Sequence, residues 1–394
     1  MFGWGLSQGF GMDNMNTAIA HNGSSRDLRL DLFRGLANWA IFLDHIPNNV
    51  VAWITMKNYG FSDAADLFVF ISGYTVALVY SRTMATSGFV VAAVGILARA
   101  WKLYVAHILL FVVYVAAIGY VAQNYGHAYL LDEFNIRRLI ADPIEFLKHG
   151  LLLEFKPLNL DVLPLYTALM ATFPPFLWLL MRTPGLALVA SFAIYAAART
   201  LNWNLASYPD GTWYFNPFAW QFLFVIGAWI SLDRTGLVRR LTASRLAVWS
   251  ALLFLSLSFA VTLAARFGFV SEVPAQIADL FLPNDKTNLA PYRILHFLAL
   301  ALVAARLVPR SAPTLKLPVL RPAIICGERS LEVFCVGIFL SFVGCFLIEL
   351  VSDSIAFQLL VSLSGIALMT AAAYYRTWIK NLRPASTPDR LRAV

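Results

Sequence analysis

Long apolar segments recur along almost the whole chain, and short polar stretches between them hold most of the charged residues. An apolar segment of about 20 residues is long enough to cross a bilayer as a helix. The pattern predicts an all-α polytopic membrane protein with about ten transmembrane helices. We expect the spans at residues 34–55, 64–82, 101–122, 162–181, 185–201, 217–232, 246–265, 291–308, 325–350 and 355–376.

The composition also indicates a membrane protein rather than a soluble one. Of the 394 residues, 59% are hydrophobic and only 13% are charged, whereas soluble proteins carry about 25% charged residues. The three cysteines, Cys326, Cys335 and Cys345, fall together in one apolar segment. Their spacing matches no zinc-binding pattern, so we assign them to packing and expect no metal site.

The basic residues are distributed unevenly between the two sides of the predicted bundle. Cytoplasmic loops of membrane proteins carry an excess of Lys and Arg. A cytoplasmic N-terminus puts most of the 30 basic residues in inner segments, and an even number of spans then places both termini in the cytoplasm. Because the net charge of +8 follows this asymmetry and accompanies no nucleic-acid-binding motif, we expect no nucleic-acid partner. The smaller outer set includes Lys57, Lys156, Arg199 and Lys286.

We expect one transmembrane domain at residues 26–380, between two cytoplasmic tails. Residues 1–25 are rich in Gly, Asn and Ser and lack the charged start and apolar run of a signal peptide, so we expect a flexible tail. Residues 381–394 are expected to form a basic tail. The sequence carries no signal for the oligomeric state.

The first span holds an unusual number of polar residues, in the stretch RLDLFRGLANWAIFLDHIPNN at residues 29–49. On a helix that turns about 100° and rises about 1.5 Å per residue, His45 lies within about 20° of Arg34 and about 16 Å deeper. That depth is near the middle of a hydrocarbon core of about 30 Å. The residues within about 60° of the same line are Asp31, Asn38, Asn48 and Asn49.

Such a stripe cannot face lipid, and ionisable groups at membrane depth are candidates for function. Pro47 has no N–H for the carbonyl of Leu43, and its ring crowds the preceding turn. We therefore expect the helix to open around Asp44 and His45. The alternative interpretation is that the stripe joins neighbouring helices by hydrogen bonds.

Several segments resemble a known family. The Arg34-to-His45 spacing and ADLFVFISGYTVAL (65–78) resemble the acyltransferase-3 superfamily. RDLRLDLFRGLANWAIFLDHIP, NLDVLPLY (159–166), YRILHFLAL (292–300) and GERSLEVFCVGIFLS (327–341) resemble its OpgC branch, the succinyltransferases of osmoregulated periplasmic glucans. The resemblance covers residues 26–380. Unlike some superfamily members, the chain has no histidine in LEVFCVG, although His296 is a candidate to replace it.

The resemblance implies an enzyme of the bacterial inner membrane with an acyltransferase-3-like helix bundle. It would move an acyl group from cytoplasmic acyl-CoA, succinyl-CoA above all, to hydroxyls of a periplasmic glucan or another envelope glycan. Acyl-CoA would be the donor substrate, and no bound cofactor is expected. The sequence leaves open whether the group is succinyl, acetyl or another acyl.

His45 is the candidate catalytic residue. An imidazole with a pKa near 6.5 accepts a hydroxyl proton near neutral pH, and a carboxylate such as Asp44 or Asp66 could hold its tautomer. Asp44 points about 100° away from His45 on an ideal helix, so a direct pair needs the distortion at Pro47. His45 could act as a base for direct attack, or it could accept the acyl group first as a nucleophile.

Two further sets of residues are candidates for binding. On the inner side, arginine and lysine would meet the phosphates of CoA, although Arg99 and Lys102 also suit simple membrane anchoring. On the outer side, an acceptor or acyl pocket is expected, in which Arg293 could meet a succinyl carboxylate. Trp203, Trp213 and Tyr214 would either stack on sugar or form an interfacial belt. The CoA set is Arg34, Arg99, Lys102 and Arg329, and the pocket set is Asn38, Asn48, Asp66, Asp161, Tyr166, Arg293 and His296.

Three alternatives remain at this point. A glycan transporter or flippase would often show repeats with broken helices in both halves, and Pro47 has no counterpart in the second half. A membrane sensor or scaffold lacks an attached signalling domain. Within the enzyme interpretation, Ser72 as the nucleophile would lack the G-x-S-x-G elbow, so Ser72 and Gly73 are assigned to close helix packing.

Overall fold

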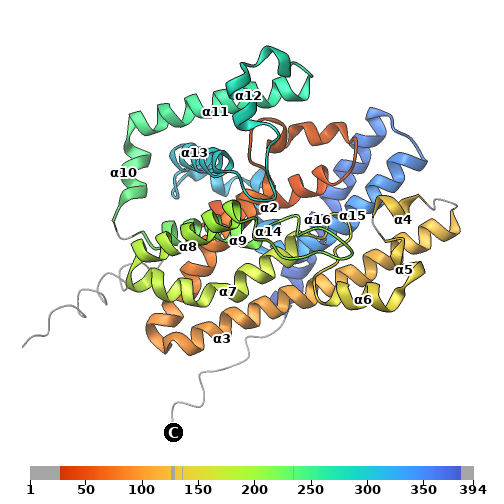
Figure 1. The fold of residues 1–394 in the computed structure, drawn as a ribbon, viewed down its shortest axis with the longest axis horizontal. Helices are drawn as coiled ribbons and strands as arrows, with labels where there is room; N and C mark the ends of the chain where they lie inside the picture. Colours follow the sequence, from red (N-terminus) through yellow and green to blue (C-terminus); the bar gives the residue numbers. More distant parts are fainter. Residues whose placement is uncertain (1–26, 126–128, 135, 234, 383–394) are drawn as a thin grey trace, which may run out of the picture.

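The computed structural model describes residues 27–125, 129–134, 136–233 and 235–382, which are drawn in colour in Figure 1. These residues form helices joined by loops, and their only β-type pairing is an isolated bridge between Ala206 and Thr212. The all-helical prediction is therefore confirmed for this part of the chain. The expected N-terminal tail, and the expected C-terminal tail beyond its first two residues, lie outside the described residues.

Each predicted span overlaps a helix, although the first one, 34–55, follows α2 only as far as Asp44. Five of the described helices, α3, α7, α11, α15 and α16, are long and apolar enough to cross a membrane, and α8 and α9 are shorter apolar helices. The number of crossings and the orientation stay predictions. The principal helices are α2 (Leu28–Asp44), α3 (Ala64–Asn124), α7 (Val162–Arg182), α8 (Pro184–Thr200), α9 (Pro217–Ser231), α11 (Arg245–Arg266), α13 (Pro291–Leu307), α14 (Arg321–Glu328), α15 (Ser330–Leu350) and α16 (Ile355–Leu382).

Short elements fill the connections. They lie chiefly in the loops that we predict to be outer ones and after the first span. They are η1 (Val50–Ile54), η2 (Met56–Asn58), α4 (Leu130–Glu133), α5 (Arg138–Ala141), α6 (Pro143–Leu151), α10 (Leu237–Ala243), η3 (Val270–Glu272), α12 (Ala275–Phe281), η4 (Pro313–Lys316) and η5 (Pro318–Leu320).

Helix α3 contains two predicted spans, and Gly88 separates them. A straight helix of 61 residues would be about 90 Å long, roughly three times the hydrocarbon thickness of a bilayer. Gly88 adopts φ 85° and ψ 174°, a region open essentially only to glycine. The chain turns back there (Figure 1), so that the Tyr80 hydroxyl donates a hydrogen bond to the Gly95 carbonyl at 3.0 Å.

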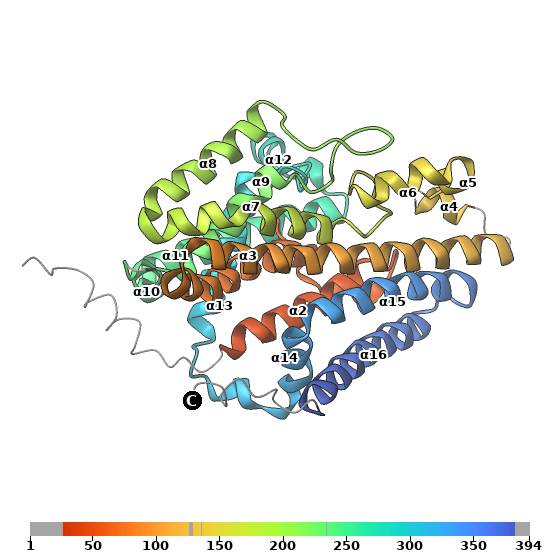
Figure 2. The same cartoon turned by 90° about the horizontal axis from the view of Figure 1, so that it is seen from below.

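Figure 2 shows α3 running through the middle of the molecule, with α7, α8 and α9 on one side and α2, α14, α15 and α16 on the other. Helix α3 packs on α7, α9 and α2, while α2 packs on α14 and α15. The buried interior is formed largely by aromatic and aliphatic side chains, among them Trp220, Phe224 and Phe173. This arrangement brings the C-terminal end of α2 close to the first residues of α3.

Two helix crossings bring backbones into direct contact at paired glycines. A Cβ on Gly73 of α3 would lie 2.0 Å from the carbonyl oxygen of Phe224, and one on Gly227 of α9 would lie 2.3 Å from that of Phe70. Likewise, a Cβ on Gly35 of α2 would lie 1.8 Å from the carbonyl oxygen of Ala323 in α14. Small residues permit such close approach, which agrees with the packing role predicted for Gly73.

We expect Gly73→Ala to destabilise the protein, because its methyl group would overlap a backbone carbonyl that cannot rotate away. Overpacking of this kind costs about 1–3 kcal/mol. Gly119→Ala is the matched control, because a Cβ at Gly119 in the same helix meets nothing within 4 Å. Thermal unfolding of both variants in detergent would check this, and equal midpoints would contradict the packing role.

Candidate active site

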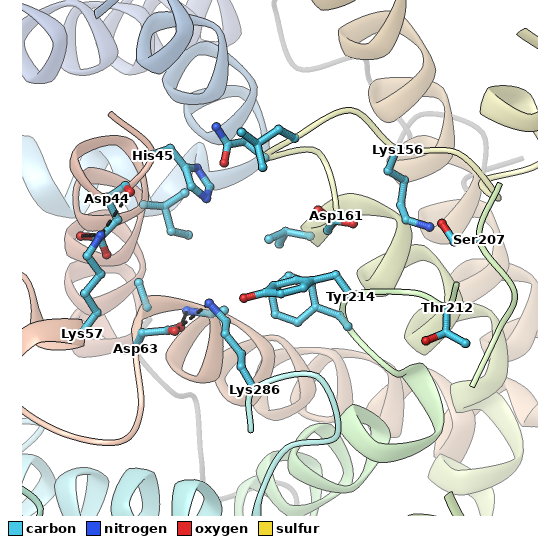
Figure 3. Close-up of a pocket in the computed structure, with 17 residues that line it drawn as sticks. Asp44, His45, Lys57, Asp63, Lys156, Asp161, Ser207, Thr212, Tyr214 and Lys286 are labelled. Carbon is cyan, nitrogen blue, oxygen red and sulfur yellow. Dashed lines mark hydrogen bonds and ion pairs between the residues drawn. The ribbon is translucent and has the colours of Figure 1, made fainter. Parts of the chain in front are cut away.

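A cavity of about 470 Å³ lies where α2 ends and where α3 and α7 begin (Figure 3). Its volume falls within the usual range for small-molecule sites, about 300–1,000 Å³. Polar and charged side chains converge on it from five separate chain segments. Those labelled in Figure 3 are Asp44, His45, Lys57, Asp63, Lys156, Asp161, Ser207, Thr212, Tyr214 and Lys286.

His45 is held at this cavity by the end of α2. Its backbone N–H donates to the Ile41 carbonyl at 3.1 Å, and the helix ends at Asp44. Pro47 cannot continue the helix, and Asn48 takes a left-handed conformation with φ 56°. The local opening predicted from Pro47 is therefore present, and the helix does not resume after it but ends at Asp44. Figure 3 shows the imidazole directed into the cavity.

The early end of α2 changes the predicted polar stripe. Only Asp31, Arg34 and Asn38 lie on the helix, because residues 45–49 form a loop. The Arg34 guanidinium donates to the Thr75 hydroxyl of α3 at 2.6 Å, and the Asn38 amide lies 3.3 Å from the Ser330 hydroxyl. The expectation that Asn48 and Asn49 continue a helical stripe is wrong, since an angular argument applies only while the helix lasts.

Asp44 interacts with residues of the following loop rather than with His45. Its carboxylate accepts a hydrogen bond from the Thr55 hydroxyl at 2.6 Å and pairs with Lys57 at 3.2 Å. The Nδ1 atom of His45 is buried and has no hydrogen-bond partner among the described residues. The other carboxylate considered as a partner, that of Asp66, is bound to Arg293. The ring is thus oriented by its backbone and packing.

An ion-pair cluster forms the side of the cavity at the start of α3. Asp63 caps this helix by accepting from the Ala65 N–H at 2.8 Å, and it pairs with Lys286 at 2.7 Å and with Arg293 at 3.3 Å. Arg293 also pairs with Asp66 at 2.6 Å. Burial alone would raise the pKa of Asp63, but Lys286 and Arg293 hold it below its usual range.

Several residues predicted for the outer pocket lie behind this cavity rather than on its wall. Arg293 is 2% exposed and its head group is held by the two carboxylates, while Asp66 is fully buried. The Nδ1 atom of His296 lies 2.7 Å from the Ser62 hydroxyl. Tyr166 packs edge-on against Phe68. None of these four residues lines the cavity described above.

Asp161 does line the cavity, and its role in binding the acceptor stays a prediction. It directly precedes the first residue of α7. Burial raises the pKa of its carboxyl to about 6, although Lys156 and Lys286 oppose this shift. At neutral pH the group is largely ionised and accepts hydrogen bonds.

The residues predicted to bind CoA occupy other parts of the bundle. Arg99 of α3 interacts with Tyr166 of α7, Lys102 is exposed, and the Arg329 Nε donates to the Thr377 hydroxyl at 3.1 Å. Together with Arg34, which lies one to two turns from the start of α2, they lie away from the wall of the cavity at His45. The structure therefore separates the candidate donor residues from the cavity.

Sequence reasoning missed the lysines of the cavity. The sequence alone predicts only that these residues, Lys57, Lys156 and Lys286, lie in outer loops. The fold brings them together around His45. Of the aromatic candidates, Tyr214 lines the cavity, whereas Trp213 is buried and lies under Lys156. Within the described part of the chain, no group of three or more His, Cys, Asp or Glu is placed to hold a metal ion.

Replacement of Arg293 by Met should strongly destabilise the protein, because Asp66 would lose the guanidinium that pairs with it and would remain buried. Breaking a buried pair in this way costs about 3–5 kcal/mol. The double variant Arg293→Met with Asp66→Asn should recover much of that loss, since the uncompensated charge is gone. Thermal unfolding in detergent checks both, and a double variant no more stable than Arg293→Met would contradict the explanation.

Comparison with known proteins adds a family assignment. Residues 26–381 match the protein-family model described as OpgC protein. No curated protein and no solved structure matches the chain. Because the matched region covers nearly all of the sequence, the chain belongs to the OpgC protein family.

Proposed function

We propose that this protein is an O-acyltransferase of the bacterial inner membrane, which moves a succinyl group from cytoplasmic acyl-CoA to hydroxyls of a periplasmic glucan. Membership of the OpgC family supports an acyltransferase role. The observation that carries the proposal is the position of His45, whose ring enters a polar cavity at the end of α2.

His45 is suited to remove a proton from a sugar hydroxyl. The hydroxyl oxygen would attack the thioester carbonyl carbon while the imidazole takes its proton. The carbon–sulfur bond would then break, and the imidazolium would return the proton to the CoA thiolate. In the second route, His45 attacks the thioester carbon and CoA leaves as its thiolate. The sugar hydroxyl then displaces the imidazole from the acyl group, and the hydroxyl proton passes to the thiolate.

The walls of the cavity suit both the reaction and a carbohydrate. Lys57 and Lys286, each paired with a carboxylate, present N–H donors at the cavity, and these would bind the thioester oxygen as negative charge develops on it. Asp161, Ser207 and Tyr214 offer a carboxylate, a hydroxyl and an aromatic face, which are groups that bind sugars by hydrogen bonds and stacking. We assign the acceptor to this outer part of the cavity.

The donor would approach from the opposite side. Arg34, Arg99, Lys102 and Arg329 are the candidates for the CoA phosphates, because guanidinium groups bind phosphate in a bidentate manner and lysine binds it as a point charge. In this arrangement only the acyl end of the donor reaches His45. The transfer then couples a cytoplasmic donor to an acceptor outside the membrane.

Replacement of His45 by Ala should abolish glucan modification, with a loss of about 100-fold or more, because the proton acceptor is removed. Ser72→Ala is the matched control: Ser72 is buried in helix packing, and this variant should keep its activity. Mass spectrometry of envelope glucans from cells with each variant checks this, and a succinyl mass increment should appear with the wild type and Ser72→Ala only.

Other outcomes of that experiment are equally informative. An acetyl increment would keep the mechanism and change the acyl group. Full modification by a stably inserted His45→Ala protein would contradict the role of His45. If purified protein moved glucan across liposomes without acyl-CoA and modified nothing, the proposal would fail and a transporter would be favoured.

Asp44→Asn should reduce transfer by no more than about tenfold, the factor that about 1.4 kcal/mol produces. Its carboxylate holds Thr55 and Lys57 rather than His45, whereas loss of a carboxylate that orients a catalytic histidine costs about 10⁴-fold. Initial rates with purified protein would distinguish the two cases. A loss as large as that of His45→Ala would mean that Asp44 turns to His45 during the reaction.

A further inference from the structure

The three lysines of the cavity are not equivalent. Lys57 pairs with Asp44 at 3.2 Å and Lys286 pairs with Asp63 at 2.7 Å. Lys156 forms no ion pair with any residue that the structure describes. It is therefore the cavity lysine whose charge is left for a ligand.

Lys156 is nevertheless held in place. Its ammonium group donates to the Leu153 carbonyl at 3.0 Å and lies 3.9 Å from the centre of the Trp213 ring. Trp213 is itself buried, and its backbone N–H is bonded to the Leu205 carbonyl at 2.9 Å. An aromatic face attracts a cation without using its protons, so two of the three ammonium protons remain for other acceptors.

The surroundings of Lys156 favour an anionic ligand. Burial lowers its pKa to about 8, against the opposing effects of Asp161 and Glu154. A partly desolvated cation that contacts no carboxylate is unfavourable, and an anion that enters the cavity would relieve this cost. Figure 3 shows Lys156 across the cavity from His45, with Asp161 and Tyr214 between them.

The proposed function leaves one source for that anion. A neutral glucan brings hydroxyls, which need no cation, and the CoA phosphates are assigned to the other side of the bundle. The acyl group is the part of the donor that reaches His45. An anion in this cavity would then be a carboxylate at the far end of the acyl chain.

We propose that Lys156 binds the free carboxylate of a dicarboxylic acyl group and thereby selects a succinyl-type donor over an uncharged one. This inference rests on the proposed function, and it assigns to Lys156 the role that the sequence suggested for Arg293. Arg293 is occupied by Asp63 and Asp66, whereas Lys156 has a charge to offer.

The test compares two donors of equal chain length, succinyl-CoA and butyryl-CoA, which differ in the terminal carboxylate. Purified full-length protein would be assayed with unmodified periplasmic glucan as the acceptor. Lys156→Met should lower kcat/KM for succinyl-CoA by about tenfold or more, the usual factor for a charge-assisted hydrogen bond. The same variant should leave kcat/KM for butyryl-CoA unchanged, and Lys156→Arg should keep part of the preference.

Lys148→Met is the matched control, because Lys148 lies on α6 a few residues earlier and pairs with Glu145 in an exposed position. It should behave as the wild type with both donors. The preference of the wild type for succinyl-CoA should also fall as the pH rises above about 8, where Lys156 loses its proton. The other titratable groups that act on Lys156 are Glu154, Asp161 and His107. An effect of these groups that is the same for both donors cancels in the ratio of the two kcat/KM values.

The outcomes separate this inference from the proposed function. If the wild type transfers neither acyl group, the proposed function fails. If the wild type is active but Lys156→Met loses activity equally with both donors, Lys156 serves the acceptor or the fold, and the inference is wrong. An unchanged preference in Lys156→Met would also overturn it.

Discussion

The compensation of charge at the start of α3 is the constraint on which the site depends. Asp63 and Asp66 stand one turn apart at this helix end. Arg293 pairs with both and Lys286 pairs with Asp63, and these two cations, from the segment around α13, compensate the buried Asp66 and the partly buried Asp63. Neither side would be tolerated alone at this depth. The cluster therefore ties two distant parts of the chain together and fixes one wall of the cavity beside His45.

The sequence was sufficient to predict the helical segments, the break near Pro47 and the packing role of Gly73, because each depends on local properties. Apolar length, a missing N–H and a missing side chain can all be read from neighbouring residues. The prediction failed where α2 stopped, since Asn48 and Asn49 no longer followed a helical period. Lys156 could not be found, because its position depends on the contact of its loop with Trp213, which no local pattern encodes.

The cavity differs from a hydrolase triad in what surrounds the histidine. Asp44 directly precedes His45 in the chain, yet its carboxylate binds Thr55 and Lys57. The cavity around the ring holds lysine–carboxylate pairs instead of a carboxylate that orients the ring. In the proposed reaction, Lys57 and Lys286 serve the chemistry, whereas Lys156 serves the choice of donor.

The paired glycines have a mechanical consequence. Where Gly35 meets Ala323 and Gly73 meets Phe224, backbone touches backbone, and no layer of side chains remains to let one helix slide along the other. Carriers of the alternating-access type work by rocking one helix bundle against another. A frame whose helices interlock at the crossings is poorly suited to that motion. We therefore expect the substrates to travel and the helices around His45 to stand still.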